Sequence, residues 1–359
     1  MTVAISQFLV AFVDALAPVG ADLVGQLPVA GIVADFVKFL SPSNLAGIVV
    51  DGLAKASVFA LIAVGLTLIF GLMGVLNFAH GSFTIVGAYV AGLVMVVVLS
   101  GGGFGARIAW FFVAVVVAFA VLAALGAFIE TQLIRPLYDR PPLYQILLTF
   151  GLTLVIDEIV RMIVDFYGLQ PRSAWQEALG TRPTWFRENH DFLGLTVEGM
   201  DLFEIALGAV VVAAVWLFLT RTRYGLFIRA GSEDSEMAEA LGVDVRRVFT
   251  VVFGIGAGLT GVAGALLMWD PSWGASVTVG ADALLPAFVV VIVGGLGTFK
   301  GTVVAALIVG LADATMTWWF QNVFVTMSWL PEVVVFAILV LVLVVKPRGL
   351  YGVQEVGGH

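Results

Sequence analysis

The chain has 359 residues, of which 61% are hydrophobic and 12% are charged, with a formal net charge of −8. This composition excludes a soluble globular domain, which would need far more polar surface to cover its core. The apolar runs are continuous, which excludes the alternating pattern of a β-barrel, and the absence of cysteine excludes disulfides and thiolate metal sites. We therefore expect an all-α integral membrane protein.

The apolar runs predict a series of membrane-spanning helices, because about 20 apolar residues cross a bilayer as one helix. The predicted spans are 47–73, 83–99, 108–129, 146–167, 205–220, 248–268, 284–293, 303–314 and 333–345. Several of these runs are too short for a full crossing. We therefore expect a polytopic helical bundle of about 8 to 10 spans, some of them discontinuous.

Three regions divide the chain. Residues 1–46 are apolar but carry Asp14, Asp22, Asp35 and Lys38, and they form an N-terminal extension that is either an extra span or an interfacial helix. Residues 47–352 form the transmembrane domain, and residues 353–359 form a C-terminal tail.

The basic residues predict the orientation, since cytoplasmic loops of membrane proteins are enriched in Lys and Arg. Arginine or lysine flanks the connections after 129, between 221 and 247, and after 345, whereas segments 270–282 and 321–332 contain neither. This pattern predicts a multi-pass protein of the cell membrane with a cytoplasmic C-terminus.

The first interruption of the apolar pattern is GVLNFAHGSFTIVGAY, residues 74–89, which carries Asn77, His80 and Gly81 and no Lys or Arg. Polar side chains within a span cost free energy and often serve a partner or a pathway. Tight helix packing at the glycines is the alternative. We interpret this stretch as a helix break that lines or gates a path.

The stretch LVIDEIVRMIVD places Asp157, Glu158 and Arg161 inside the predicted span 146–167. Each charge at a helix centre costs roughly 2.5–3.5 kcal/mol on insertion scales. Arg161 follows Asp157 by four residues and Glu158 by three, so the charges can neutralise one another. We expect an intramembrane ion pair that holds two helices, with a role in proton or ion coupling as the alternative. Asp51 and Lys55 form a similar pair.

The segment TRTRYGLFIRAGSEDSEMAEALGVDVRRVF, residues 220–249, is the most polar part of the transmembrane domain, with five arginines and five acids. It predicts a short helix that Ser232 caps and Gly242 ends. Met237, Ala240 and Leu241 give this helix one apolar stripe. The segment is either a solvated loop or a docking helix for a groove in a partner.

A second interruption, VVVIVGGLGTFKGTVVAALIVG, residues 289–310, repeats the pattern of the first with Gly294, Gly295 and Gly297. Interrupted segments in corresponding positions of two halves indicate discontinuous helices around a transport path. Close helix packing again is the alternative.

Motifs for catalysis are absent. The three histidines are too scattered for a metal site, and no G-x-x-x-x-G-K-[ST] phosphate loop occurs. The match GAGLTG, residues 256–261, lies inside a predicted span and follows no strand, so we regard it as accidental. We therefore expect no catalytic residue, metal, cofactor or nucleic-acid partner, and any ATP must be bound by another chain.

Four blocks carry a resemblance to a known family: GLTLIFGLMGVLNFAHGSFTIVGAYV, GLFIRAGSEDSEMAEALGVDVRRV, GGLGTFKGTVVAALIVG and KPRGLYG. Together they resemble the permeases of branched-chain amino acid ABC transporters, in the hydrophobic amino acid uptake family. The likeness runs from about Leu53 to Gly352 in the order of the family's blocks. Lys300 is a departure, because a small or neutral residue is expected there.

The resemblance implies the permease subunit of an ATP-driven importer for branched-chain or hydrophobic amino acids. It implies four kinds of partner: a second related permease, two ATP-binding subunits, an extracytoplasmic substrate-binding protein and the lipid bilayer. It also implies contact with the ATPase at one set of loop residues, namely Arg229, Ala230, Asp234, Ala240, Leu241 and Gly242.

Three other functions remain open, of which one is a membrane scaffold without transport. Related permeases carry urea or short amides. An ion-coupled secondary transporter with Asp157, Glu158 and His80 as a relay would need no partner chain.

Overall fold

The computed structural model describes residues 35–98, 102–166, 180–192, 195–270, 273, 279–323 and 330–352. The predicted tail 353–359 and residues 1–34 of the predicted extension lie outside this described part. The long helices are α3 (Pro42–Met73), α4 (His80–Val98), α5 (Phe104–Ile129), α6 (Pro142–Phe166), α8 (Gly199–Arg221), α11 (Val245–Trp269), α12 (Val279–Gly294), α13 (Phe299–Asn322) and α14 (Leu330–Val345).

Shorter elements connect them. These are the π-turn η1 (Glu130–Ile134), the 3-10 turns η2 (Arg135–Leu137) and η3 (Thr184–Arg187), the helices α9 (Arg223–Glu233) and α10 (Ser235–Ala240), and the antiparallel hairpin of β1 (Asn189–Phe192) and β2 (Leu195–Glu198). Apart from that hairpin, the described ordered elements are helical, which confirms the predicted fold class.

Within the described ranges, six helical stretches are long and apolar enough to cross a membrane. They are α3, α4, α5 with its two following turns, α8, α11 and α13. Two further apolar helices, α12 and most of α14, are shorter, as expected of discontinuous segments. The predicted span 303–314 was too short, because α13 continues to Asn322 over 24 residues. Some of its hydroxyl groups bond within the helix, as when Thr315 donates to the Leu311 carbonyl at 2.7 Å.

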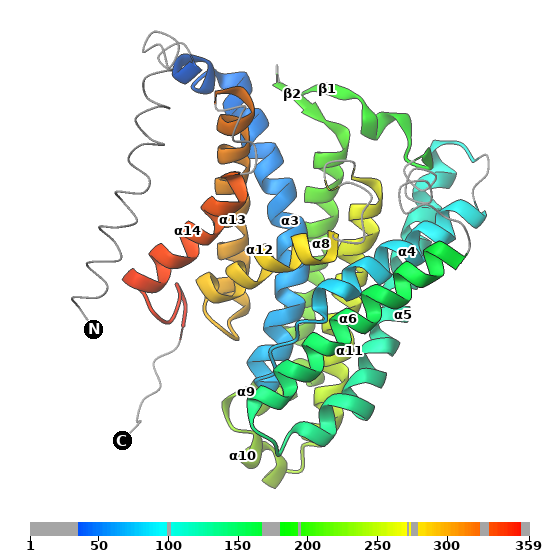
Figure 1. Cartoon of the computed structure of the whole chain (residues 1–359), viewed down its shortest axis with the longest axis vertical. Helices are drawn as coiled ribbons and strands as arrows, with labels where there is room; N and C mark the ends of the chain where they lie inside the picture. Colours follow the sequence, from blue (N-terminus) through cyan, green and yellow to red (C-terminus); the bar gives the residue numbers. More distant parts are fainter. Residues whose placement is uncertain are drawn as a thin grey trace.

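Helix α3 is the centre of the bundle, with α8, α11, α12 and α13 packed against it (Figure 1). From Val58 to Leu66 its residues are apolar on all sides, which is typical of a helix surrounded by others. Small residues allow its neighbours to approach closely. At Gly65, an added Cβ would lie 2.6 Å from the carbonyl oxygen of Gly256 in α11, so this crossing requires glycine.

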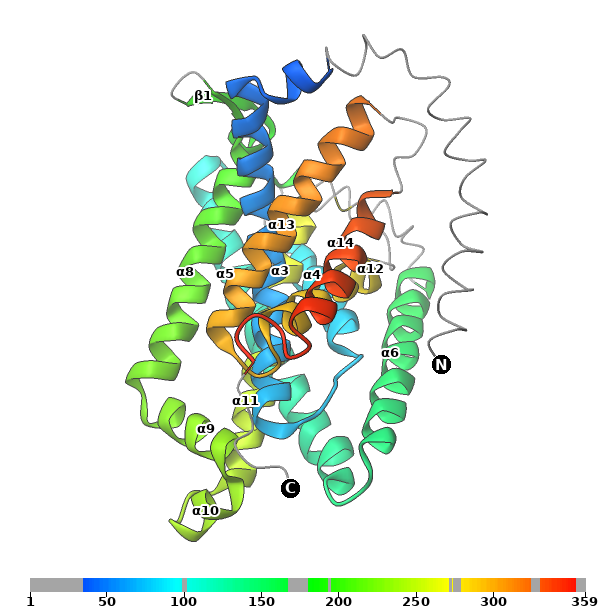
Figure 2. The same ribbon diagram turned by 90° about the vertical axis from the view of Figure 1, so that its left-hand side faces the viewer.

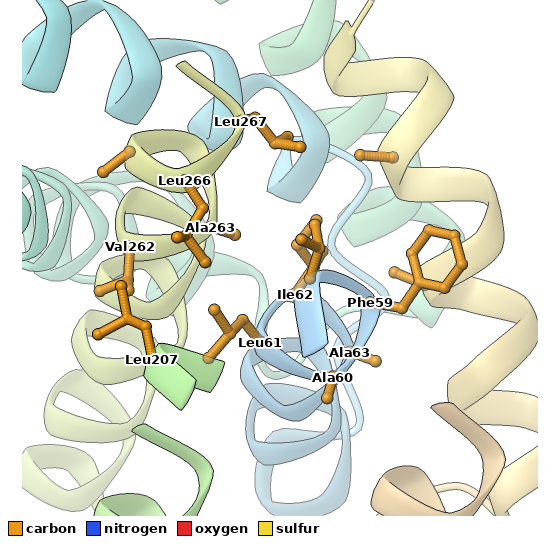
Figure 3. Close-up of a cluster of buried hydrophobic side chains, with 14 of the residues drawn as sticks. Phe59, Ala60, Leu61, Ile62, Ala63, Leu207, Val262, Ala263, Leu266 and Leu267 are labelled. Atoms are coloured by element: carbon orange, nitrogen blue, oxygen red, sulfur yellow. The ribbon is translucent and has the colours of Figure 1, made fainter. Parts of the chain in front are cut away.

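The core lies where α3 meets α8 and α11 (Figure 3). Phe59, Leu61 and Ile62 of α3 are buried in one cluster with Leu207 of α8 and Leu266 of α11. Burial of such side chains stabilises the fold by roughly 1.5–3 kcal/mol each.

The two ends of the bundle differ (Figures 1 and 2). The β1–β2 hairpin and the start of α3 lie at one end, here called the hairpin end. Helices α9 and α10 project from the opposite end, here called the α10 end. Helices α6 and α8 stand on opposite sides of the molecule in Figure 2.

Candidate functional site

Helices α9 and α10 form the projection at the α10 end, and capping side chains define both of them. The Thr222 hydroxyl accepts from the Gly225 amide at 3.0 Å, and Asp234 Oδ1 accepts from the Met237 amide at 2.8 Å. Asp234 has φ −156° and ψ 100°, so it ends α9 and begins α10. The prediction that Ser232 caps the short helix was therefore wrong: Ser232 lies within α9 and donates to the Arg229 carbonyl.

The end of α10 was predicted correctly. Gly242 has φ 87°, a left-handed conformation that glycine adopts at no steric cost. The amides of Gly242 and Val243 donate back to the carbonyls of Glu239 and Ala238. The chain then turns into α11, where Asp244 caps the Arg247 amide at 3.1 Å.

Exposed apolar residues lie on α10 and at its C-terminal end, beside the exposed Glu236 and Glu239. Leu241 is 78% exposed and Met237 is 57% exposed, whereas Ala238 is buried against the rest of the chain. Ala240 is also exposed. Contiguous exposed apolar side chains occur at contacts with proteins, membranes or ligands. The remaining predicted coupling residues, Arg229 and Ala230, lie in α9.

A buried carboxylate joins the turns after α5 to the start of α11, and the sequence analysis did not identify it. Glu130, in the π-turn after α5, is fully buried. Its oxygens accept hydrogen bonds from Arg135 at 3.1 and 2.7 Å, from Tyr138 at 2.6 Å and from Thr250 at 2.8 Å. Burial, and then the hydrogen bond to Glu130, raise the pKa of Tyr138, so its phenol stays protonated as a donor. The only sequence signal was an acid just beyond a predicted span.

A helix break is present at Asn77 and His80, as predicted. Helix α3 ends at Met73, Gly74 has φ 64°, and α4 begins at His80. Asn77 Oδ1 accepts from the Ala79 amide at 3.1 Å. His80 Nε2 lies 3.1 Å from the Ile62 carbonyl oxygen, and a carbonyl only accepts, so Nε2 carries the proton.

Both polar side chains of this break are fully buried. The Nδ2 atom of Asn77 and the Nδ1 atom of His80 have no hydrogen-bond partner in the described part of the chain. Gly81 packs on α12, where an added Cβ would lie 2.9 Å from the Leu284 Cβ. The break is therefore embedded among helices.

The second break separates α12 from α13. Gly295 and Gly297 have φ angles of 102° and 79°, which are positions that favour glycine. The KPRGLYG block folds back onto this break, since the amides of Leu350 and Tyr351 donate to the carbonyls of Val293 and Gly294 at 2.8 and 3.0 Å. Helix α12 therefore joins the two breaks: Gly81 packs along it, and Gly294 ends it.

Among the described residues, the charges of α6 form no ion pair with another helix. Glu158 and Arg161 form a pair at 3.2 Å on α6 itself, with side chains 59% and 55% exposed. Asp157 faces Ser82 of α4. By contrast, Lys55 of α3 pairs with Asp51 at 3.4 Å, as predicted, and more closely with Asp313 of α13 at 2.8 Å.

The described residues contain no group of three or more His, Cys, Asp or Glu side chains arranged to hold a metal ion. The predicted site residues fall into three separate places: the projection, the two breaks and the exposed face of α6.

Comparison with known proteins decides the family. Residues 48–343 match the family described as the permease component of branched-chain amino acid transport systems. The chain belongs to this family. The resemblance carried by the four sequence blocks is thereby confirmed, and the chain is a multi-pass membrane protein of a family of transport permeases.

Curated relatives cover most of the chain. It is 28% identical over 309 residues to the high-affinity branched-chain amino acid transport system permease protein LivH of Escherichia coli K12, covering 85% of this chain and 95% of that protein. It is 29% identical over 313 residues to the permease protein BraD of Pseudomonas aeruginosa, covering 86% and 95%. A probable LivH of Methanocaldococcus jannaschii is 28% identical over 302 residues, covering 83% and 90%. These relatives are permease subunits, which are not enzymes.

Among solved structures, PsaBC from Streptococcus pneumoniae in complex with Fab aligns with 89% of this chain and 98% of its own. The TM-score is 0.43 and the identity 14%, so this likeness supports no conclusion about the chain.

Proposed function

We propose that the chain is the transmembrane permease subunit of an ATP-driven importer that carries branched-chain or other hydrophobic amino acids. Membership of the permease family and the names of the relatives support this substrate class. The observation that carries the ATP-driven mechanism is the exposed apolar surface of α10, because this chain has no phosphate-binding loop of its own. Two ATP-binding subunits supply the hydrolysis.

The coupling contact in this proposal is made by α10. Leu241 and Met237 insert into a groove of an ATP-binding subunit, as an amphipathic helix does. Movement of α10 passes directly into α11 through the short turn at Asp244. The hydrogen bond that Thr250 of α11 donates to Glu130 makes the end of α5 follow the same movement.

The proposed orientation places the α10 end in the cytoplasm. Arginines gather there, at Arg221, Arg223, Arg229, Arg246 and Arg247, as the positive-inside rule requires. The hairpin end then faces outward, where an extracytoplasmic binding protein delivers the substrate. The protein lies in the cell membrane with its C-terminus in the cytoplasm.

The two breaks form the gate of the proposed path. Asn77, His80 and Gly81 at the first break, and Gly294, Gly295 and Gly297 at the second, act as hinges on either side of α12. Because α12 packs along α3 and α4 and ends at the second break, its displacement would shift both breaks together. Such rigid-body movement of a packed helix is a common form of gating.

The second permease covers α6 in this proposal. Glu158 and Arg161 are more than half exposed on a helix that is otherwise largely apolar. Charges in contact with hydrocarbon are costly and usually face protein or water. A second permease packed against this face would shield the charges of Glu158 and Arg161 from the lipid. The transport path would then lie between the two subunits.

The Leu241→Asp variant tests the proposal. The new carboxylate would have no hydrogen-bond or ion-pair partner in an apolar groove of the ATP-binding subunit. We therefore expect leucine uptake by cells carrying the full transporter to fall to background, while the amount of the variant in the membrane stays normal. Leu241→Met preserves the apolar surface and serves as the matched control. Normal uptake by Leu241→Asp, or gradient-driven uptake by the purified chain alone in liposomes, would count decisively against ATPase coupling at α10.

A further inference from the structure

Two adjoining cavities form one groove along α3, α8 and α13. The larger has a volume of about 750 Å³ and lies between the middle parts of α3 and α8 and the first part of α13. The smaller, of about 500 Å³, lies between the same helices and α9. The two share Trp216, Phe299 and Lys300 in their walls. We refer to them together as the α8–α13 groove.

The upper wall of the groove is apolar. Ile205 and Val212 of α8 face Val303, Val304 and Leu307 of α13 across it. Ile205 and Trp216 are 11 residues apart on α8 (216 − 205), which corresponds to about 16 Å along a helix. The groove is therefore elongated, and its walls are apolar over much of its length.

The charged residues of the groove are all basic and lie nearest the α10 end. Lys300 is the second residue of α13 and Arg229 belongs to α9. Both are exposed, and their charged groups have no hydrogen-bond or ion-pair partner among the described residues. No Asp or Glu lines either cavity. A ligand of this groove therefore presents an anion near α9 and an apolar part toward the hairpin end.

Trp216 lies where these two parts meet, five residues before α8 ends at Arg221 (221 − 216). Tryptophan is enriched at the boundary between hydrocarbon and headgroups. Its place in the groove sets the depth at which the charged and apolar parts of a ligand would separate.

We propose that the α8–α13 groove binds an anionic phospholipid. The phosphate pairs with Lys300 and Arg229, and one acyl chain extends along α8 and α13. Basic pockets between membrane helices near the cytoplasmic surface recognise anionic headgroups in this way. A transported amino acid fits less well, because the groove offers no carboxylate to its ammonium group. This inference is independent of the transport activity proposed above. Helix α8, which lines the groove, stands on the opposite side of the molecule from α6 (Figure 2).

Lipid binding is measured directly by native mass spectrometry of the full-length protein in detergent, titrated with phosphatidylglycerol or phosphatidylcholine of the same acyl chains. We expect phosphatidylglycerol to be retained preferentially. Each of Lys300→Gln and Arg229→Gln should lower its retention about fivefold, whereas Lys300→Arg retains it. Phosphatidylcholine binding should change little in the charge variants.

A matched pair on α8 tests the apolar part of the groove. Ala213 lines the larger cavity, whereas Ala214, also exposed, does not. Ala213→Phe should reduce retention of both lipids and Ala214→Phe should leave it unchanged. Ala209→Phe, which fills the same cavity, replaces Ala213→Phe if the latter does not fold.

Four outcomes would overturn the proposal. They are undiminished phosphatidylglycerol retention in Lys300→Gln, equal effects of Ala213→Phe and Ala214→Phe, displacement of the lipid by millimolar inorganic phosphate, and displacement by leucine. The third would identify a free-anion site, and the fourth would make the groove part of the substrate path. None of them bears on whether α10 couples the chain to an ATPase.

Discussion

The guanidinium of Arg135 holds the buried carboxylate of Glu130 with two parallel hydrogen bonds, Nε to Oε1 at 3.1 Å and Nη2 to Oε2 at 2.7 Å. The same Nη2 lies 2.6 Å from the hydroxyl oxygen of Thr250. Two segments that are distant in sequence, the turns after α5 and the start of α11, are thereby fixed to one carboxylate. A π-turn at this position is consistent with a specialised role, since such turns are rare and often lie at functional sites.

We predict that Arg135→Ala destabilises the protein by about 3 kcal/mol, because it leaves a buried carboxylate without its charged partner. Thermal unfolding in detergent measures this. The double variant Glu130→Leu with Arg135→Met should be less destabilised than Arg135→Ala, since it removes the charge together with its partner. If the double variant is the less stable of the two, the pair contributes net stability beyond satisfying Glu130.

The close packing of α11 against α4 leads us to predict that a substitution at Gly264 lowers stability. An added Cβ at Gly264 would overlap the Thr84 carbonyl oxygen and would lie 2.6 Å from the Ala88 amide nitrogen. Gly264→Ala should therefore force these helices apart, at a cost of about 1–3 kcal/mol. Gly151 of α6 has open space at the same position, so Gly151→Ala should be neutral or slightly stabilising. Equal melting temperatures for the two variants would contradict the close packing at Gly264.

Replacement of the polar side chains at the first break tests the proposed gate. In Asn77→Ala with His80→Phe, the Ala79 amide loses its cap and the Ile62 carbonyl loses its donor. Loss of a cap alone costs about 1 kcal/mol. If the break is a hinge, leucine uptake should fall further than the amount of protein in the membrane. Uptake that falls only in proportion to abundance would show a purely structural role.

We predict that the stability of the protein depends on pH through Glu198 at the hairpin end. Burial raises the pKa of Glu198 from its ordinary value of 4.5, although Arg182, whose guanidinium lies 3.6 Å away, opposes the shift. Asp270 and Asp51 add to the increase. Because the folded state binds the proton more tightly, this contribution to stability is fully present below pH 4.5 and is lost as the pH rises through the raised pKa.

Glu198→Gln removes this titration. The melting temperature of the variant should therefore rise relative to the unsubstituted protein as the pH increases from about 4 to 8. Glu188→Gln, at an exposed position at the same end, controls for the loss of one charge. A constant difference in melting temperature across the range would show that Glu198 does not titrate differently on folding.

Local sequence patterns predicted the positions of several elements of the candidate site. Asn77 and His80 interrupt an apolar run, and the chain breaks its helix there. Gly242 ends α10 because glycine adopts the left-handed backbone conformation at the lowest steric cost. The prediction that Ser232 caps α10 was wrong. Ser232 and Asp234 are both residue types that cap helices, and the direction in which α9 reaches α10 decides which of them is the cap.

Local patterns could not predict ion-pair and hydrogen-bond partners that are distant in the sequence. Lys55 was expected to pair with Asp51, four residues before it, yet its shorter bond is to Asp313, 258 residues later. Likewise, a carboxylate just beyond a predicted span gives no sign that Arg135, Tyr138 and Thr250 will surround it.

By itself, the sequence determined that this chain is a helical membrane permease, where its helices break, and which segment carries the apolar stripe of α10. These properties depend on hydropathy and on local backbone preferences, which neighbouring residues decide. Only the tertiary structure decided that the breaks are buried around α12, that the Glu158–Arg161 pair lies exposed on α6, and that Lys300 and Arg229 share one groove. Those relationships depend on which helix faces pack together, and residues far apart in the chain decide that jointly.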